Sequence, residues 1–307
     1  MVETMLKESM LYLARQESIR TFVVGNQATR RMARRFVAGE TLEEAIGAAQ
    51  KLNARHIGVS LDHLGENVAD AGKARATADE YVRTLDRIQA SGVEANISVK
   101  LTALGLDIDK DLCRANLMQV LRRAQEYNAF VRVDMEGSDY TEHTVALVSD
   151  LHRQFSNVGT VIQSYLYRSP DDVAQLIDQG VRVRLVKGAY LEDPTLAFPH
   201  KADVDAQYVL LMRALLERGV YPAIATHDER IIEEAIRIAN AHGVARARFE
   251  FQMLYGIRRD LQERLAALGY NVRVYVPYGS QWYPYLTRRM AERPANMIFV
   301  MSNTFRK

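Results

Sequence analysis

The feature that most constrains the fold is an alternation of strand-like and helix-like segments through most of the chain. Segments between the strand-like runs repeat apolar residues with the period of a helix. Strict alternation of this kind implies a parallel sheet, and eight units over roughly 250 residues match an α/β (βα)8 TIM-like barrel. The strand-like runs are residues 56–64, 95–101, 130–136, 160–166, 181–187, 221–227, 248–254 and 271–277.

The N-terminal stretch, residues 1–55, is expected to be a helical arm, with Thr41 and Glu44 at the spacing of a capping box. No linker rich in proline, glycine or serine interrupts the units that follow. We therefore expect one barrel catalytic domain over residues 56–307. Within it, Ser169 is predicted to cap a helix whose first turn holds a proline and whose end is marked by Gly180.

Several strand-like runs alternate polar and apolar residues, whereas ordinary parallel strands are apolar on both faces. In a barrel the apolar set must meet the helices, so the polar set points inward. The charged members of that set are Lys100, Arg132, Asp134, Glu136, Arg182, Arg184, Glu250 and Arg273. Cations outnumber anions by five to three there, and unpaired buried charge is costly, so the excess predicts a bound anion. A purely structural ion-pair network is the alternative.

The last stretch, residues 275–293, combines groups that suit a small zwitterion. A helix is predicted to begin near Pro284, and its spacing places Tyr285, the adjacent arginines at 288 and 289, and Glu292 on one face. Arginine forks bind a carboxylate bidentately, the ring offers apolar contact and the acid can pair with an ammonium. A solvated helix whose arginines form surface pairs is the other interpretation.

Composition excludes several classes of protein. Lys and Arg number 40 against 38 Asp and Glu, a net charge of +2, which gives no argument for nucleic-acid binding. The single cysteine, Cys113, excludes an internal disulfide and is compatible with a reducing compartment. No signal peptide or membrane-spanning run is apparent, so we expect a cytoplasmic protein. The basic cluster of Arg30, Arg31, Arg34 and Arg35 is either a solvated face or a contact with a membrane surface or partner.

Cofactor motifs restrict the chemistry further. The sequence contains neither a P-loop nor a Gly-x-Gly-x-x-Gly turn after a strand, so a Rossmann site is not expected. Asp62, His63 and Glu66 follow the first strand and His227 follows the sixth. These potential metal ligands are scattered, and we expect no catalytic metal.

Lys187, just past the fifth strand, supports two interpretations. A desolvated lysine among cations becomes nucleophilic and could form a Schiff base, as in aldolases. Alternatively, Lys187 and the amide of Gly188 could hold a phosphate, because glycine lets the backbone come close. The residues alone do not choose between them.

A set of ordered motifs resembles the proline dehydrogenases, from about residue 20 to residue 303. The two most specific are Arg184-Leu-Val-Lys-Gly-Ala-Tyr190 and Tyr285-Leu-Thr-Arg-Arg-Met-Ala-Glu292. The others lie in residues 98–104, 133–136, 163–168, 225–227, 249–254 and 275–279. The resemblance implies a distorted (βα)8 flavoenzyme with its final helix over the barrel mouth.

The resemblance also implies an activity. Such an enzyme oxidises L-proline to Δ1-pyrroline-5-carboxylate by hydride transfer to N5 of FAD, the first step of proline degradation to glutamate. It passes the electrons to a membrane quinone, so peripheral contact with the inner face of the membrane is compatible with a cytoplasmic location. At 307 residues the chain is too short for the aldehyde dehydrogenase module of fused relatives, which implies a monofunctional enzyme.

The same resemblance implies residue roles. Asp134 would lie beside the flavin and the substrate amine, and Arg184 would donate to the flavin N5 edge. The proline site would comprise Lys100, Arg288 and Arg289 on the carboxylate, Leu254, Tyr275 and Tyr285 around the ring, and Glu292 orienting the cations. The rest of FAD would be lined by Met135, Gln163, Val186, Lys187, Gly188, Ala189, Thr226, His227 and Gln252. Two alternatives remain: a Schiff-base aldolase that uses Lys187, and a non-catalytic barrel that binds an anion.

Overall fold

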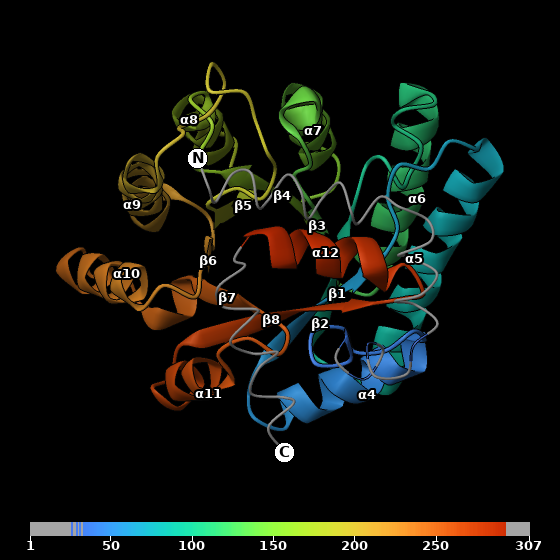
Figure 1. Cartoon of the computed structure of the whole chain (residues 1–307), viewed down its shortest axis with the longest axis horizontal. Coiled ribbons are helices and arrows are strands. Elements are labelled where there is room, and N and C mark those ends of the chain that lie inside the picture. Colours follow the sequence, from blue (N-terminus) through green and yellow to red (C-terminus); the bar gives the residue numbers. More distant parts are fainter. Residues whose placement is uncertain (1–25, 27–28, 30, 32, 293–307) are drawn as a thin grey trace.

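Eight parallel strands form a closed barrel in which each strand pairs with the next and β8 returns to β1. The computed structural model describes residues 26, 29, 31 and 33–292, and helices surround the strands (Figure 1). The strands are β1 (Gly58–His63), β2 (Ala95–Val99), β3 (Val131–Val133), β4 (Val158–Gln163), β5 (Arg182–Val186), β6 (Ala223–Ala225), β7 (Glu250–Leu254) and β8 (Asn271–Tyr278). The (βα)8 barrel predicted from the alternation is confirmed.

The helices follow the strands in strict alternation. They are α4 (Leu42–Asn53), α5 (Ala71–Ser91), α6 (Lys110–Glu126), α7 (Ser138–His152), α8 (Ser169–Asp178), α9 (Lys201–Arg218), α10 (Glu229–Ala241), the 3₁₀ turn η1 (Arg246–Arg248), α11 (Arg259–Ala267) and α12 (Trp282–Glu292). In the described chain the longest is α5, which Asp70 caps at its start and Gly92 ends with φ +65°.

Side chains alternate along the strands, so that one face of the sheet packs against the helices and the other lines the barrel interior. Ile97 and Val99 on β2, and Phe251 on β7, are fully buried in the main apolar core beneath the helices. Burial of each such side chain stabilises the fold by about 1.5–3 kcal/mol. Their neighbours Ser98 and Gln252 are equally buried but belong to the opposite, polar face, which lines the barrel interior.

The helical arm predicted for residues 1–55 is described only in part. The capping box at the start of α4 is confirmed, since the Thr41 side chain accepts from the Glu44 amide and the Glu44 side chain caps in return. Ala45 and Ala49 of α4 are fully buried in the main core with the barrel strands. The described part of the arm therefore packs as part of the barrel, while the boundary at residue 55 stays a prediction.

The start of α8 differs from its prediction. Arg168, not Ser169, occupies the N-cap position, and the Ser169 hydroxyl donates to the Gln163 carbonyl at 2.6 Å. A serine in the first turn can bond to the preceding strand instead of to its own helix, so the cap residue moves back by one. Gly180 has φ +72° just past the helix, as predicted.

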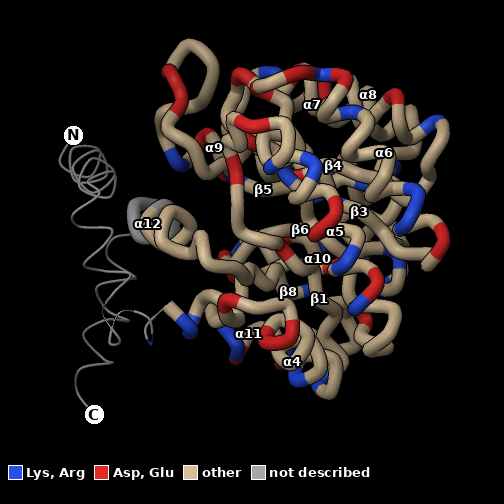
Figure 2. Tube along the Cα trace, turned by 90° about the vertical axis from the view of Figure 1, so that its right-hand side faces the viewer, with Lys and Arg blue, Asp and Glu red and all other residues tan. Residues whose placement is uncertain are grey.

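The final helix, α12, lies across one opening of the barrel in Figure 1 and off the same end in the turned view of Figure 2. It begins at Trp282, two residues before the predicted Pro284, which is tolerated in a first turn because those N–H groups lack helical partners. A separate apolar cluster attaches α12 to an N-terminal segment and to the end of β1. That cluster consists of Ala33, Phe36, Val37, Leu64, Trp282, Tyr283, Tyr285 and Leu286.

Surface charge is mixed in sign. Figure 2 shows Lys and Arg interspersed with Asp and Glu over the helices around the barrel. Of the basic cluster predicted near the N-terminus, Arg31, Arg34 and Arg35 are exposed, Arg34 pairs with Glu44 at 3.2 Å, and Arg30 lies outside the described residues. Within the residues that the structure describes, no helix combines the length and apolar character needed to cross a membrane.

Candidate active site

Asp134 is the centre of a buried polar cluster at the carboxyl ends of the strands. It directly follows β3 and is 8% exposed. Its Oδ1 accepts from Nη1 of Arg184 at 2.8 Å, and its Oδ2 accepts from the Tyr275 hydroxyl at 2.7 Å. Nζ of Lys100 lies 3.4 Å from the same Oδ2. One carboxylate thus joins three side chains from three other strands, and the sequence-predicted Lys100, Asp134, Arg184 and Tyr275 converge.

Lys100 has a second carboxylate partner, which the sequence reasoning missed. Nζ of Lys100 donates to Oδ1 of Asp62 at 2.7 Å, and Asp62 on β1 is fully buried. The sequence suggests Asp62 only as one of several scattered potential metal ligands. The alternation of Val59 and Leu61 with Ser60 and Asp62 was the available signal, since it places Asp62 on the inward face.

The charges of this cluster shift the pKa values of its members in opposite directions. Burial raises the pKa of Asp62, against the effect of Lys100. Burial also acts to raise the pKa of Asp134, but Lys100 and Arg184 together lower it below its usual value. Burial acts to lower the pKa of Lys100, yet Asp62 and then Tyr275 hold it well above its ordinary value. Asp134 is therefore the carboxylate that stays ionised.

Arg184 is fixed from several sides at once. Its Nε donates to Oε1 of Gln252 at 2.5 Å, and its Nη2 lies 3.1 Å from the Ser98 hydroxyl. The guanidinium also stacks on the Tyr275 ring at 5.2 Å from the centroid. Because each of these partners lies on a different strand, the guanidinium has little freedom to turn.

A continuous column of polar side chains leads from this cluster towards the other end of the barrel. Gln252, which accepts from Arg184, donates in turn to the Glu250 carboxylate. Glu250 is 2% exposed and accepts from Nε of Arg273 at 3.0 Å. Asp62 adds a fourth inward carboxylate to the three that the sequence suggested. Because burial raises the pKa of Asp62, it offsets less of the positive charge than Asp134 does.

Gln163 and Gly188 shape one side of the barrel opening. The Gln163 amide donates to the Glu136 carbonyl at 3.0 Å and accepts from the Ala189 amide at 3.3 Å. Gly188 has φ +129°, and a Cβ there would lie 2.5 Å from the Tyr165 ring. The backbone after β5 therefore runs flat against Tyr165, which only glycine permits.

Lys187 lies among anions, not among the cations that a Schiff-base lysine needs. Its Nζ is 2.6 Å from Asp205 and 3.2 Å from Asp228. Burial acts to raise the pKa of Asp205, but hydrogen bonds from Lys187 and Lys201 lower it. The geometry therefore favours a lysine held in ion pairs with two carboxylates over the Schiff-base interpretation.

The remaining predicted cofactor residues lie at the ends of neighbouring strands. Nε2 of His227 accepts from the Leu254 amide at 2.9 Å, so this nitrogen carries no proton. The Thr226 hydroxyl accepts from the Asp228 amide at 3.1 Å. Met135 follows Asp134 and is 7% exposed, and Val186, the last residue of β5, is half-buried. Met135 packs in the main apolar core and Val186 packs against it, so their assignment to the cofactor stays a prediction.

The predicted substrate residues of α12 are described in part. Tyr285 is 5% exposed and packs in the apolar cluster that holds α12 in place. The side chains of Arg288, Arg289 and Glu292 lie outside what the structure describes. Their positions place them on the helix that crosses the barrel opening (Figure 1).

With this geometry in view, comparison with known proteins identifies the family. The family model described as proline dehydrogenase matches residues 45–302. The chain belongs to the proline dehydrogenase family. Proline dehydrogenase from Deinococcus radiodurans is 43% identical over 306 residues, covering 98% of each chain. Proline dehydrogenase 1 of Bacillus subtilis is 39% identical over 303 residues, covering 99% of this chain and 100% of that one.

A solved structure agrees in fold. The crystal structure of proline utilization A (PutA) from Bdellovibrio bacteriovorus, inactivated by N-propargylglycine, matches with a TM-score of 0.82 and 26% identity. The match covers 94% of this proline dehydrogenase family member and 38% of that larger chain. The barrel is therefore shared with a much longer protein.

Glu136 gives a pH-dependent prediction that is separate from turnover. Burial raises its pKa to about 7, although hydrogen bonds from Thr102 oppose the shift. Between pH 4.5 and about 7 the folded protein keeps a proton that the unfolded chain releases, so stability falls as the pH rises through this window. Glu136→Gln has no carboxyl group to titrate at this position. Its free energy of unfolding relative to that of wild type should therefore increase by up to about 3 kcal/mol from pH 5 to pH 8.

Urea unfolding at both pH values measures this difference. Glu233→Gln, an exposed glutamate on α10, is the matched control and should show the pH dependence of wild type. Equal pH dependence in Glu136→Gln and wild type would show that Glu136 titrates normally.

Proposed function

We propose that this protein oxidises L-proline to Δ1-pyrroline-5-carboxylate, the first step of proline degradation to glutamate. The observation that carries the proposal is the convergence of Lys100, Asp134, Arg184 and Tyr275 on one carboxylate at the mouth of a proline dehydrogenase-family barrel. The relatives named above share this activity in their names. The ionised Asp134 is suited to a substrate with a nitrogen hydrogen-bond donor.

FAD is the cofactor that we assign to this opening, and the residues present fit it. Gly188 lets the backbone after β5 pack directly against the Tyr165 ring, and we assign the flavin to the opening beside this segment. Lys187, which pairs with Asp205 and Asp228 in this structure, is assigned to the diphosphate, and Thr226 and Gln163 are assigned to polar contacts. Met135, Val186, Ala189, His227 and Gln252 complete the assigned lining. A flavin held there would supply the acceptor for the hydride that leaves the carbon beside the proline nitrogen, at its N5.

The protein's own residues would bind and orient the substrate. Asp134 would accept a hydrogen bond from the proline nitrogen, which fixes the direction of the reacting carbon. Arg184, held by Gln252 and Asp134, would stabilise the negative charge that develops at the flavin edge. The carboxylate and ring contacts are assigned to Lys100, Leu254, Tyr275, Tyr285, Arg288 and Arg289, with Glu292 orienting the arginines.

Electrons would leave to a quinone in the membrane. Such an acceptor requires the barrel opening to meet a membrane surface, and the exposed Arg31, Arg34 and Arg35 are suited to anionic headgroups. A cytoplasmic protein with peripheral contact at the inner face of the membrane is consistent with this route.

A visible spectrum of the purified protein tests the function directly. We expect flavin absorption bands that bleach on anaerobic addition of L-proline and return when a quinone analogue is added. A protein with flavin bands that proline leaves unchanged would exclude proline oxidation but retain the cofactor assignment. A colourless protein that FAD does not restore would exclude both.

The arginine pair of α12 gives a prediction for substrate binding. Arg288→Met or Arg289→Met should raise KM for proline by about 10- to 100-fold with flavin content kept, because each removes a charged fork from a carboxylate. Steady-state kinetics with a dye acceptor measures the change. Arg237→Met, an exposed arginine paired within α10, serves as the control. Unchanged proline affinity in either variant would contradict the carboxylate assignment.

A further inference from the structure

A second polar pocket, of about 170 Å³, lies at the opposite end of the barrel from Asp134. Among its lining residues, Ala95 begins β2, Arg182 begins β5 and Glu250 begins β7, while Phe130 precedes β3. The reaction assigned above belongs to the carboxyl ends of the strands, where (βα)8 barrels carry their active sites. The proposed function assigns no ligand to this amino-terminal pocket.

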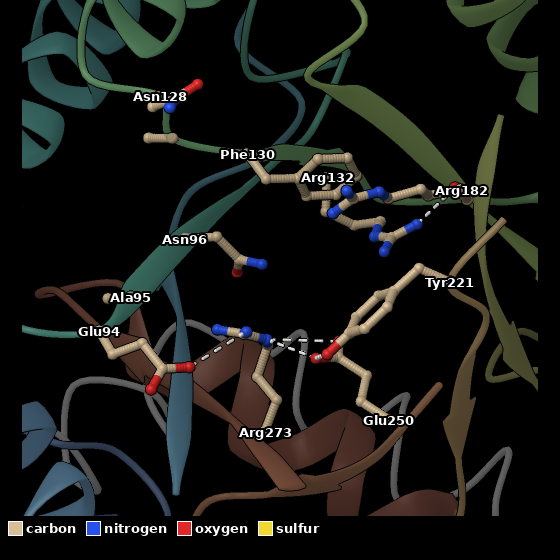
Figure 3. Close-up of a pocket in the computed structure, with 11 residues that line it drawn as sticks. Glu94, Ala95, Asn96, Asn128, Phe130, Arg132, Arg182, Tyr221, Glu250 and Arg273 are labelled. Carbon is tan, nitrogen blue, oxygen red and sulfur yellow. Dashed lines mark hydrogen bonds and ion pairs between the residues drawn. The ribbon is translucent and has the colours of Figure 1, made fainter. Parts of the chain in front are cut away.

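One side of the pocket is electrically balanced. Arg273 donates through Nε to Glu250 at 3.0 Å, and its Nη2 lies 3.6 Å from Glu94. Its Nη1 donates to the Val59 carbonyl at 2.8 Å. In Figure 3 this group occupies the side of the pocket opposite Arg132 and Arg182.

The other side carries two arginines that have no carboxylate partner in the described part of the chain. Arg132 is 2% exposed, and its Nη1 donates only to carbonyls, those of Thr160 at 3.0 Å and Arg182 at 2.6 Å. Its buried Nε has no hydrogen-bond partner there. The Arg182 guanidinium lies on the rings of Phe130 and Tyr221, at 5.1 and 5.2 Å from their centroids.

These two cations also lie close to one another. The Arg132 guanidinium is 4.7 Å from the same Phe130 centroid that Arg182 contacts. Burial, and then the positive charges of Arg184 and Arg182, lower the pKa of Arg132 well below its ordinary value, although Glu250 opposes the shift. Arginine does not give up its proton in proteins, so an anion bound beside Arg132 would stabilise a charge that Glu250 offsets only in part.

The backbone is shaped to hold the arginine pair. A Cβ at Gly159 would lie 2.3 Å from the Arg182 carbonyl, 2.8 Å from the Phe130 ring and 3.0 Å from Nη1 of Arg132. Glycine at this position is therefore required for the two arginines to meet. Asn96, 8% exposed, extends its side-chain amide into the same space, and its Nδ2 is the atom that can donate to an anion there (Figure 3).

We propose that this pocket binds a small, doubly charged oxyanion such as sulfate or hydrogen phosphate between Arg132 and Arg182. Guanidinium forks match the oxygen spacing of such anions, and the Asn96 amide adds a neutral donor. The volume exceeds tenfold the roughly 15 Å³ that admits one water molecule, so the anion enters with some of its water. Glu94 and Glu250 on the far side restrict the site to small anions.

Thermal unfolding of the FAD-loaded enzyme tests the proposal. Sodium sulfate or phosphate is titrated against sodium chloride at matched ionic strength, because sulfate also stabilises proteins without binding to them. We expect a saturable rise in Tm in wild type. In Arg182→Gln the half-saturating concentration should rise about tenfold or more, because a charged donor is lost. Arg248→Gln, an exposed arginine at the same end of the barrel but outside the pocket, should respond as wild type does.

A second variant keeps the test decisive if Arg182→Gln does not fold. Asn96→Asp places a carboxylate of nearly the same shape beside the arginines, so it should raise Tm in chloride and abolish the saturable sulfate response. Proline turnover should be unchanged in both variants. Either an equal sulfate response in wild type and all variants, or a response that never saturates, would overturn the proposal and leave the proline assignment untouched.

Discussion

Asp134→Asn is expected to lower kcat/KM for proline by about 10²- to 10⁴-fold while the barrel remains folded and keeps its flavin. The substitution preserves shape but removes the charge that accepts from Arg184 and Tyr275 and pairs with Lys100. Because Lys100 and Arg184 hold the pKa of Asp134 below its usual value, the carboxylate is ionised at any pH suitable for assay. The loss should therefore be present throughout the pH profile.

Steady-state kinetics, together with flavin absorbance per protein, measures this effect. Asp178→Asn, which changes an exposed acid at the end of α8, should behave as wild type. Loss of flavin in Asp134→Asn would assign the residue to cofactor retention, and turnover within tenfold of wild type would remove it from the reaction.

Gly188→Ala is expected to destabilise the protein by about 3 kcal/mol or more and to release most of its flavin. The added Cβ would lie 2.5 Å from the Tyr165 ring, in a backbone conformation of φ +129° that only glycine adopts readily. Tyr165 cannot move away freely, because its amide donates to the Lys187 carbonyl at 2.9 Å and its hydroxyl to Glu192 at 3.2 Å. The strain must therefore be relieved by displacing the backbone beside the proposed cofactor.

Denaturant unfolding and the flavin absorbance ratio measure the two effects. Gly92→Ala is the matched control: its φ is +65°, but a Cβ there meets nothing within 4 Å. It should lose only about 1 kcal/mol and no flavin. Equal losses in the two variants would mean that backbone conformation alone, and not the close approach to Tyr165, explains the result.

Much of the fold could be predicted because hydrophobic periodicity is a local property. The alternation of Ile97 and Val99 with Ser98 and Lys100 predicts both the strand and its inward face from the sequence alone. Strand ends were less certain. The fourth strand was predicted at 160–166 but spans Val158–Gln163. The Ser164 amide still bonds to Val186 at the end of β5, and the Tyr165 amide bonds to Lys187 beyond it.

The site was predicted less completely, because partners from distant strands are not visible in one sequence. The predicted barrel and the family resemblance together place four of the site residues in one interior: Lys100, Asp134, Arg184 and Tyr275. The pairing of Asp62 with Lys100 depends on register across β1 and β2, which no local pattern gives. The amino-terminal pocket was missed as a site for the same reason, since only the closed barrel brings Arg132 and Arg182 to one ring.

Hydrogen bonds join Arg184 through Gln252 to Glu250, which lies at the amino-terminal end of the barrel. A residue remote from the substrate therefore helps to hold Arg184 in place. Removal of the Glu250 carboxylate would free Gln252, and a freed Gln252 would in turn loosen the guanidinium that aligns Asp134. Anyone redesigning this barrel for a new amine should therefore hold Glu250 constant, although it is remote from the substrate. Otherwise, a variant that is inactive because Gln252 and Arg184 have lost this hydrogen-bonded support would be misread as one whose substrate pocket does not fit the new amine.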